Sequence, residues 1–377
     1  MALSVVVAPD SFKGSLAAGA AARAIALGWS SLRPDDTVTI SPQADGGEGT
    51  LDAIEAAVPG AARHSAGLVT GPDGRPTPGE WLRLDGDVAV VELAQCSGLP
   101  LMAALDPAGA TTRGFGEVIA AALDDGATSL VLALGGSAST DGGTGALAAL
   151  GLGLADAAGV PLSDGGGALS SLVYLDTSSL RAPPVGGVTL LTDVTSPLLG
   201  PAGAARVFGP QKGATPEQVE ALGSALARFA GIVGAEPSVP GSGAAGGTAY
   251  GFASLWGATI RPGAEYLASL AGLDQQVADA DVVILGEGRF DEQSLAGKVA
   301  SHVLAVAGDQ GTTPGIIAGL VEARVSTASG TPIWSIALVD LAGSVEAALT
   351  EPERWLREAG ARAALELGCA LEPNVSS

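Results

Sequence analysis

Short apolar runs alternate along this chain with polar, glycine-containing turns and stretches of helical periodicity. The first run, V-V-V-A-P at residues 5–9, is followed by D-S-F-K-G-S at 10–15, and apolar residues then recur at helical spacing from Leu16 to Leu27. A β-branched run that stops at a proline is typical of a buried parallel strand. Ser15 is placed to cap the helix that follows. The pattern predicts a ligand-binding turn at 10–15, because ligands bind at the carboxyl ends of strands in open α/β sheets.

The order of strand, glycine-containing turn and helix recurs several times along the chain. Residues 63–84 instead show glycine, proline and arginine between short extended pieces, which predicts β-hairpins. Amphipathic helices are expected after residue 50 and at 113–123, and T-P-E-Q at 215–218 is a helix-capping signal. Further strands are expected at residues 37–40, 88–93, 130–134, 188–191, 281–285, 316–318 and 333–336. A length of 377 residues then predicts two α/β domains.

Composition and charge narrow the class of protein. The chain is 47% apolar and 15% charged, and no apolar run reaches the length of a membrane-spanning helix. A net charge of −22 argues against nucleic acid or an anionic membrane as a partner. The first nine residues lack the basic segment and cleavage site of a signal peptide, so a cytoplasmic protein is expected. Two cysteines and two histidines offer no disulfide framework and no histidine-rich metal site.

Lysine is rare in this sequence. The three lysines, Lys13, Lys212 and Lys298, all adjoin a glycine. A glycine lets the backbone approach a ligand, and an ammonium group suits a phosphate oxygen, so a phosphate-binding role is indicated. The alternative is that biased codon usage suppresses lysine and the survivors fall anywhere.

Two glycine-rich turns follow expected strands. They are Q-A-D-G-G-E-G-T at 43–50 and G-G-S-A-S-T-D-G-G-T-G-A at 135–146. Backbone amides that converge at a helix N-terminus can cradle phosphate, which is the functional interpretation. Helix capping in the first turn, and close packing of helix on sheet in the second, would also favour glycine.

Acidic side chains supply the remaining candidates. Asp193 lies at the end of the strand expected at 188–191, which makes it the best candidate for a general base. In G-E-G-R-F-D-E-Q-S at 286–294, the carboxylates Glu287, Asp291 and Glu292 lie close to Arg289 in a predicted turn. Mg²⁺ commonly binds one or two carboxylates together with substrate phosphates. A solvated surface turn is the alternative.

Two nucleotide-binding signatures are weak or absent. G-S-G-A-A-G at 241–246 formally matches a dinucleotide fingerprint, but prolines and not a strand precede it. S-L-A-G-K-V at 294–299 lacks the upstream glycine and the following Ser or Thr of a P-loop.

Seven motifs in order resemble the bacterial type I glycerate kinase family. They are A-P-D-S-F-K-G-S, A-D-G-G-E-G-T, G-G-S-A-S-T-D-G-G-T-G, D-V-T-S-P-L-L-G, V-F-G-P-Q-K-G-A-T-P-E, G-A-A-G-G and G-E-G-R-F-D-E-Q-S-x-x-G-K. The resemblance implies phosphorylation of D-glycerate by ATP with Mg²⁺, most often on the 2-hydroxyl. It also implies a Rossmann-like parallel-sheet domain made from both chain ends (1–64 plus 262–377) with a second α/β domain (65–261) inserted, and an active site in the cleft between them.

The resemblance also suggests roles for the candidate residues. Asp193 would orient or deprotonate the glycerate hydroxyl, while Lys13 and Arg289 would bind the substrate carboxylate or the transferring phosphoryl group. Other substrate contacts are expected from Asp10, Ser11, Gly46 and Gly47. The metal ligands would be Asp45, Glu287 and Asp291. ATP phosphates would contact Gly136, Ser137, Gly142, Gly143, Gly145 and Lys212.

Three alternatives remain open from the sequence. The same kinase could form 3-phosphoglycerate. An NAD(P)-dependent hydroxyacid dehydrogenase would use the 241–246 match, and a non-catalytic small-molecule binding protein would also place glycine loops at a ligand site. The sequence does not predict the oligomeric state.

Overall fold

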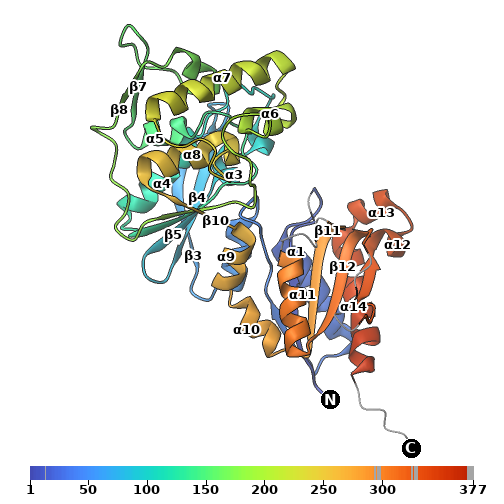
Figure 1. Cartoon of the computed structure of the whole chain (residues 1–377). Helices are drawn as coiled ribbons and strands as arrows, with labels where there is room; N and C mark the ends of the chain where they lie inside the picture. The colour runs from blue at the N-terminus through green and yellow to red at the C-terminus, as the bar shows by residue number, and fades with distance from the viewer. Residues whose placement is uncertain (13, 293, 295–298, 324–325, 327–329, 372–377) are drawn as a thin grey trace, which may run out of the picture. The chain divides into compact units, whose positions relative to one another are not determined.

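The structure is a computed structural model that describes all residues except 13, 293, 295–298, 324–325, 327–329 and 372–377 (Figure 1). The chain divides into two compact units. Unit 1 comprises Met1–Asp45, Asp52–Pro59 and Ala264–Ser377, and unit 2 comprises Gly46–Leu51 and Gly60–Gly263. The predicted fold class, with a parallel-sheet domain made from both chain ends, is confirmed.

Unit 1 is built on a five-stranded sheet in the order β13-β12-β11-β1-β2, and all its neighbouring strands are parallel. In chain order along the unit this is the doubly wound arrangement 2-1-3-4-5, in which the direction of winding reverses between β1 and β11. The strands are β1 (Ser4–Pro9), β2 (Thr37–Ile40), β11 (Val282–Phe290), β12 (Thr313–Val321) and β13 (Trp334–Ala337).

Helices cover both faces of this sheet, because successive side chains of a strand point to opposite sides. Val5 and Val7 pack with Trp29 of α1 on one face, whereas Val6 and Ala8 join a separate core on the other face. Helix α14 belongs to the first layer, and α10 and α11 belong to the second (Figure 1). These helices are α1 (Ala18–Leu32), α9 (Gly263–Leu270), α10 (Leu273–Ala278), α11 (Val299–Gln310), α12 (Leu338–Ala342), α13 (Val345–Thr350) and α14 (Pro352–Ala370).

Unit 2 has a six-stranded mixed sheet in the order β10-β9-β6-β5-β4-β3. The strands β5, β6, β9 and β10 run parallel, while β3 and β4 form the predicted hairpin and add an antiparallel edge. A separate pair, β7 with β8, is antiparallel. The strands are β3 (Ala62–Thr70), β4 (Pro76–Leu84), β5 (Val88–Glu92), β6 (Ser129–Ala133), β7 (Gly153–Ala155), β8 (Tyr174–Asp176), β9 (Val188–Leu191) and β10 (Thr259–Arg261).

The helices of unit 2 pack on this sheet and on one another. Phe115 of α4 and Phe252 of α8 make an edge-to-face contact, with ring centroids 6.0 Å apart, inside the main core. The helices are α3 (Leu93–Ser97), α4 (Arg113–Asp124), α5 (Thr144–Ala149), α6 (Ala204–Phe208), α7 (Pro216–Val233) and α8 (Ala244–Trp256). Three 3₁₀ turns lie at Leu99–Leu101, Gly166–Ser171 and Pro210–Lys212. Helix α2 (Thr50–Ala57) begins in unit 2 and continues in unit 1.

Local patterns predicted most elements, with two corrections. Ser15 does not cap α1: its hydroxyl donates to the Phe12 carbonyl at 2.9 Å in a tight turn, and the helix begins at Ala18. The strand predicted at 281–285 continues to Phe290, because β12 pairs with it along its whole length. None of the described helices is both long and apolar enough to cross a membrane.

Candidate active site

The carboxyl edge of the unit 1 sheet carries polar side chains where the winding reverses. Asp10 directly follows β1, and its amide donates to the Gly286 carbonyl of β11 at 2.7 Å. Glu287 and Arg289 lie on the last part of β11, paired in register with Ala318 and Leu320 of β12. They are therefore on a rigid strand and not in the predicted turn. Open α/β sheets bind ligands at this position.

A cavity of about 460 Å³ opens at this edge, entirely within unit 1. Its polar lining includes Asp10, Ser11, Glu287, Arg289 and Asp291, so the structure brings five predicted site residues together around one space. The volume falls in the range of typical small-molecule sites.

Ion pairs and turns fix the orientation of two of these side chains. The Arg289 guanidinium donates to Glu322 Oε1 at 2.7 Å, and this bond raises the pKa of Arg289 above its ordinary value. The Asp291 amide donates to Ser294 Oγ at 3.2 Å, and the Ser294 amide returns a bond to Asp291 Oδ1 at 3.3 Å. Arg289 thus stays cationic, and Asp291 is held in a closed turn beside the cavity.

Three carboxylates line a second, smaller cavity of about 30 Å³ in the same unit: Asp10, Asp45 and Glu287. Carboxylate oxygens suit Mg²⁺, which keeps several waters and binds substrate phosphates as well. Within the described part of the chain, no three His, Cys, Asp or Glu side chains come close enough to hold a metal ion by themselves. The donor set therefore fits an ion shared with a phosphate better than a site made by the protein alone.

In unit 2 the glycine turn after Asp45 lies across the carboxyl ends of the parallel strands. The Gly135 amide donates to the Gly46 carbonyl at 3.0 Å, and a Cβ at Gly135 would come within 2.4 Å of the Gly47 Cα. Gly46 has φ +85°, which favours glycine, and a Cβ there would approach Leu191 at 3.0 Å. These glycines let the two predicted loops contact each other directly.

Glu92 anchors this turn, and sequence analysis missed it. The side chain ends β5, is 4% exposed, and accepts the amides of Gly49 and Leu51, each at 3.0 Å. Two donors at the N-terminus of α2 are thereby satisfied by a residue more than forty positions away. The available signal was a single acidic residue closing the apolar run V-A-V-V-E.

Asp193 follows β9 as predicted, two residues beyond the strand end. Its Oδ1 accepts the Gly263 amide at 2.8 Å, and its side chain lies at the surface. An exposed carboxylate oriented by a backbone amide can accept a proton from a substrate hydroxyl.

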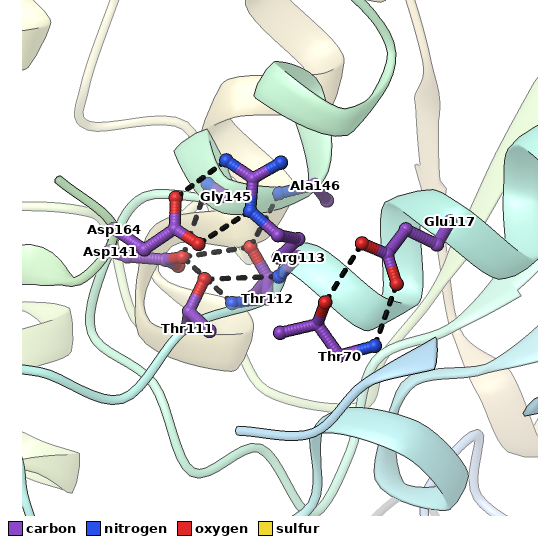
Figure 2. Close-up of polar contacts among 9 residues, drawn as sticks. All are labelled: Thr70, Thr111, Thr112, Arg113, Glu117, Asp141, Gly145, Ala146 and Asp164. Carbon is purple, nitrogen blue, oxygen red and sulfur yellow. Dashed lines mark hydrogen bonds and ion pairs between the residues drawn. The ribbon is translucent and has the colours of Figure 1, made fainter. Parts of the chain in front are cut away.

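Asp141 organises the second glycine loop (Figure 2). Its buried carboxylate accepts the Thr112 amide at 2.9 Å, the Thr112 hydroxyl at 2.8 Å, the Gly143 amide at 3.0 Å and the Gly145 amide at 3.3 Å. Beside this group, Arg113 makes a two-bond contact with Asp164, at 2.6 and 2.8 Å (Figure 2). Asp164 begins the segment D-G-G-G-A at 164–168, and the ion pair gives that aspartate a structural role.

The loop amides predicted to hold phosphate are thus largely engaged inside the protein. Gly143 and Gly145 donate to Asp141, and Gly142 donates to the Gly246 carbonyl at 3.0 Å. Among the described residues, no hydrogen bond uses the amides of Gly136 and Ser137. The phosphate contacts expected from this loop therefore stay a prediction.

Lys212 lies under that first turn and not on the surface. It is 2% exposed, and its Nζ donates to Ser137 Oγ at 2.9 Å and to the Ser139 carbonyl. Burial lowers the pKa of Lys212 to about 8, although Asp141 acts in the opposite direction. In this geometry Lys212 positions Ser137, and its contact with ATP stays a prediction.

Two other predicted features are the remaining lysines and the 241–246 segment. Lys13 and Lys298 lie outside the described residues. The 241–246 segment does not follow a strand, and left-handed backbone at Ala245, Gly246 and Gly247 kinks the start of α8. A Cβ at Gly246 would come within 2.2 Å of the Ser139 carbonyl oxygen, so this glycine permits close packing.

The fold and these sites define the class of protein: an α/β enzyme with charged side chains at the carboxyl ends of the parallel strands of two sheets. The model of the glycerate kinase family matches residues 5–367. The chain therefore belongs to the glycerate kinase family and is a phosphotransferase that acts on an alcohol group.

Similar proteins agree with this assignment. The chain is 42% identical to a glycerate 2-kinase of Escherichia coli strain K12 over 81% of its own length and 82% of that protein. It is 41% identical to a glycerate kinase of Bacillus subtilis strain 168, over 81% and 82% of the two chains. A crystal structure from Salmonella typhimurium LT2, provisionally described as a glycerate kinase 2, superposes with a TM-score of 0.81 at 35% identity and covers 98% of this chain and 99% of that one.

Proposed function

We propose that this protein transfers the γ-phosphoryl group of ATP to the 2-hydroxyl of D-glycerate, with Mg²⁺, forming 2-phosphoglycerate and ADP. The observation that carries the proposal is the 42% identity to a glycerate 2-kinase along four fifths of both chains. The polar cavity at the carboxyl edge of the unit 1 sheet adds support, because its guanidinium is suited to an anionic substrate and its carboxylates are suited to the Mg²⁺ that accompanies ATP.

Phosphoryl transfer depends mainly on positioning and on stabilising charge. Asp193 would orient or deprotonate the acceptor hydroxyl, and the Gly263 amide fixes the direction of its carboxylate. Lys13 and Arg289 would bind the substrate carboxylate or the transferring phosphoryl group. These two cations would offset part of the repulsion that a chain of net charge −22 exerts on an anion.

The remaining roles are assigned to residues of both units. Asp45, Glu287 and Asp291 would hold Mg²⁺, and the ion, when bound, neutralises charge on phosphate oxygens. Asp10, Ser11, Gly46 and Gly47 would contact substrate, and the Gly136–Ser137 turn would offer its amides to phosphate. An enzyme that consumes ATP works where ATP is supplied, so the predicted cytoplasmic location belongs to this proposal.

The test is release of ADP by the purified chain. We expect release only when D-glycerate, ATP and Mg²⁺ are all present, and we expect EDTA to abolish it. L-glycerate is the matched control for the acceptor. Turnover that does not depend on glycerate, or a change in nicotinamide absorbance with NAD(P) and no metal, would contradict the proposal.

A further inference from the structure

The 460 Å³ cavity of unit 1 has a second, apolar side that the acceptor does not explain. Besides the polar residues, the lining includes six aliphatic side chains: Leu320, Leu338, Val339, Val345, Ala348 and Leu349. Most of this wall comes from α12 and α13, beyond the end of β13. Val345 is 59% exposed and Leu349 is 56% exposed, so the wall leaves apolar surface in water.

Glycerate is a poor match for such a wall. A three-carbon acid with one carboxylate and two hydroxyls has almost no apolar surface to set against leucine and valine. It would also fill only a small part of the cavity. Polar groups transferred from water to an apolar surface lose hydrogen bonds, so glycerate would favour the polar end alone.

A purine nucleoside matches both size and chemistry. The cavity volume lies within the range of pockets that enclose drug-sized ligands, and such pockets combine mainly apolar walls with a few fixed polar groups. The faces of a purine are apolar and would cover the exposed aliphatic side chains. The phosphates of a nucleotide would then extend toward the polar end, where Ser11 and Arg289 supply donors.

The position in the fold favours the same ligand. The cavity lies at the carboxyl ends of β1 and β11, between which the winding of the sheet reverses. Nucleotides bind at this point in doubly wound sheets. In unit 2, by contrast, three of the predicted phosphate-binding amides already have internal acceptors.

The geometry points to this cavity as the binding site for the nucleoside part of the phosphoryl donor. The base lies against Leu338, Val345 and Leu349, and the phosphates run toward Arg289. The site rests on the proposed use of ATP, and it places the nucleoside in unit 1, whereas the contacts predicted from the glycine loop at 135–146 concern the phosphates alone. Ser137 and Lys212 then do not bind the base.

Photolabelling of the whole chain locates the base directly. The probe is 8-azido-ATP, with excess ADP as competitor and mass spectrometry of the labelled peptides as the readout. We expect ADP-sensitive label in residues 319–320 or 338–349. Specific label at 135–146 or 209–213, or label that ADP does not displace, would overturn the assignment. Adenosine should compete with the probe, whereas ribose 5-phosphate at equal concentration should not.

A pair of leucine variants supplies a measurement independent of turnover. Leu349→Asn changes the aliphatic wall, and Leu365→Asn changes a similarly exposed leucine (53%) on α14 that does not line the cavity. By calorimetry we expect the dissociation constant for ADP to rise about fivefold or more in Leu349→Asn, because apolar contact is lost, and to stay within about twofold in Leu365→Asn. Equal effects in the two variants would refute the site.

Parallel kinetics separate this inference from the proposed function. We expect Leu349→Asn to raise the KM for ATP by a similar factor and to leave the KM for D-glycerate unchanged. If the unaltered chain consumes ATP with glycerate while label maps elsewhere, the pocket assignment fails and the function stands. If ADP protects 338–349 but no glycerate-dependent turnover occurs, the function fails and the pocket stands.

Discussion

The buried ammonium of Lys212 gives a direct test of the loop geometry in unit 2. Its ordinary pKa of 10.5 falls to about 8 because burial removes water from the charged form. At 1.36 kcal/mol for each pKa unit, this change means that the protein disfavours the charged form by roughly 3 kcal/mol more than water does. The attraction of Asp141 is thus smaller than the cost of burial.

The assay is NMR of the chain labelled with ¹³Cε-lysine, in which three lysines give three signals. We expect one signal to titrate near pH 8, and we expect that signal to be missing from the Lys212→Met variant. Titration of the Lys212 signal near 10.5 would refute the buried position and its bonds to Ser137 and Ser139.

The same pKa predicts how stability depends on pH. Between pH 8 and 10.5 the unfolded chain holds a proton on Lys212 that the folded chain has released. Stability of the unaltered protein should therefore rise through this window relative to Lys212→Met, by up to ~3 kcal/mol, and the difference should be constant below pH 8. Urea unfolding of the two proteins at several pH values measures it. If the difference in stability between the two proteins does not change with pH, the lowered pKa of Lys212 is contradicted.

Three further substitutions test other parts of the account. Asp193→Asn should lower kcat about 100-fold or more while ADP binding is unchanged, and near-normal turnover would remove the general-base role. Asp141→Ala removes four hydrogen bonds to a buried carboxylate and should destabilise unit 2 by roughly 4 kcal/mol in thermal or urea unfolding. A loss of stability below ~1 kcal/mol would show that this hydrogen-bond network contributes little. Glu92→Gln leaves only one acceptor oxygen for the Gly49 and Leu51 amides. Hydrogen exchange at one of these two amides should therefore become about tenfold faster. Unchanged exchange at both amides would contradict the anchoring role of Glu92.

Local signals in the sequence predicted local structure well. The apolar run before Pro9 is β1, the hairpin expected at 63–84 is β3 with β4, and Thr215 and Gln218 form the predicted capping box of α7. Each of these depends on neighbouring residues alone. The resemblance of seven ordered motifs then identified the family, which the family match confirms.

Partners distant in the sequence were not predictable from one chain. Nothing in the local pattern links Glu92 to Gly49 or Asp141 to Thr112, since folding alone brings these residues together. The same reason explains why the glycines at 142–145 resembled a phosphate cradle, although an internal carboxylate accepts two of their amides. The predicted sharing of one active site by both domains stays a prediction.

The central claim is the reaction itself, and ³¹P NMR of the product tests it most directly. The unaltered protein is incubated with D-glycerate, ATP and Mg²⁺, and the phosphorus spectrum is compared with authentic 2- and 3-phosphoglycerate. The account predicts 2-phosphoglycerate together with an equal amount of ADP. A spectrum with 3-phosphoglycerate would contradict the proposed acceptor hydroxyl, and one with no phosphoglycerate would contradict the proposed reaction.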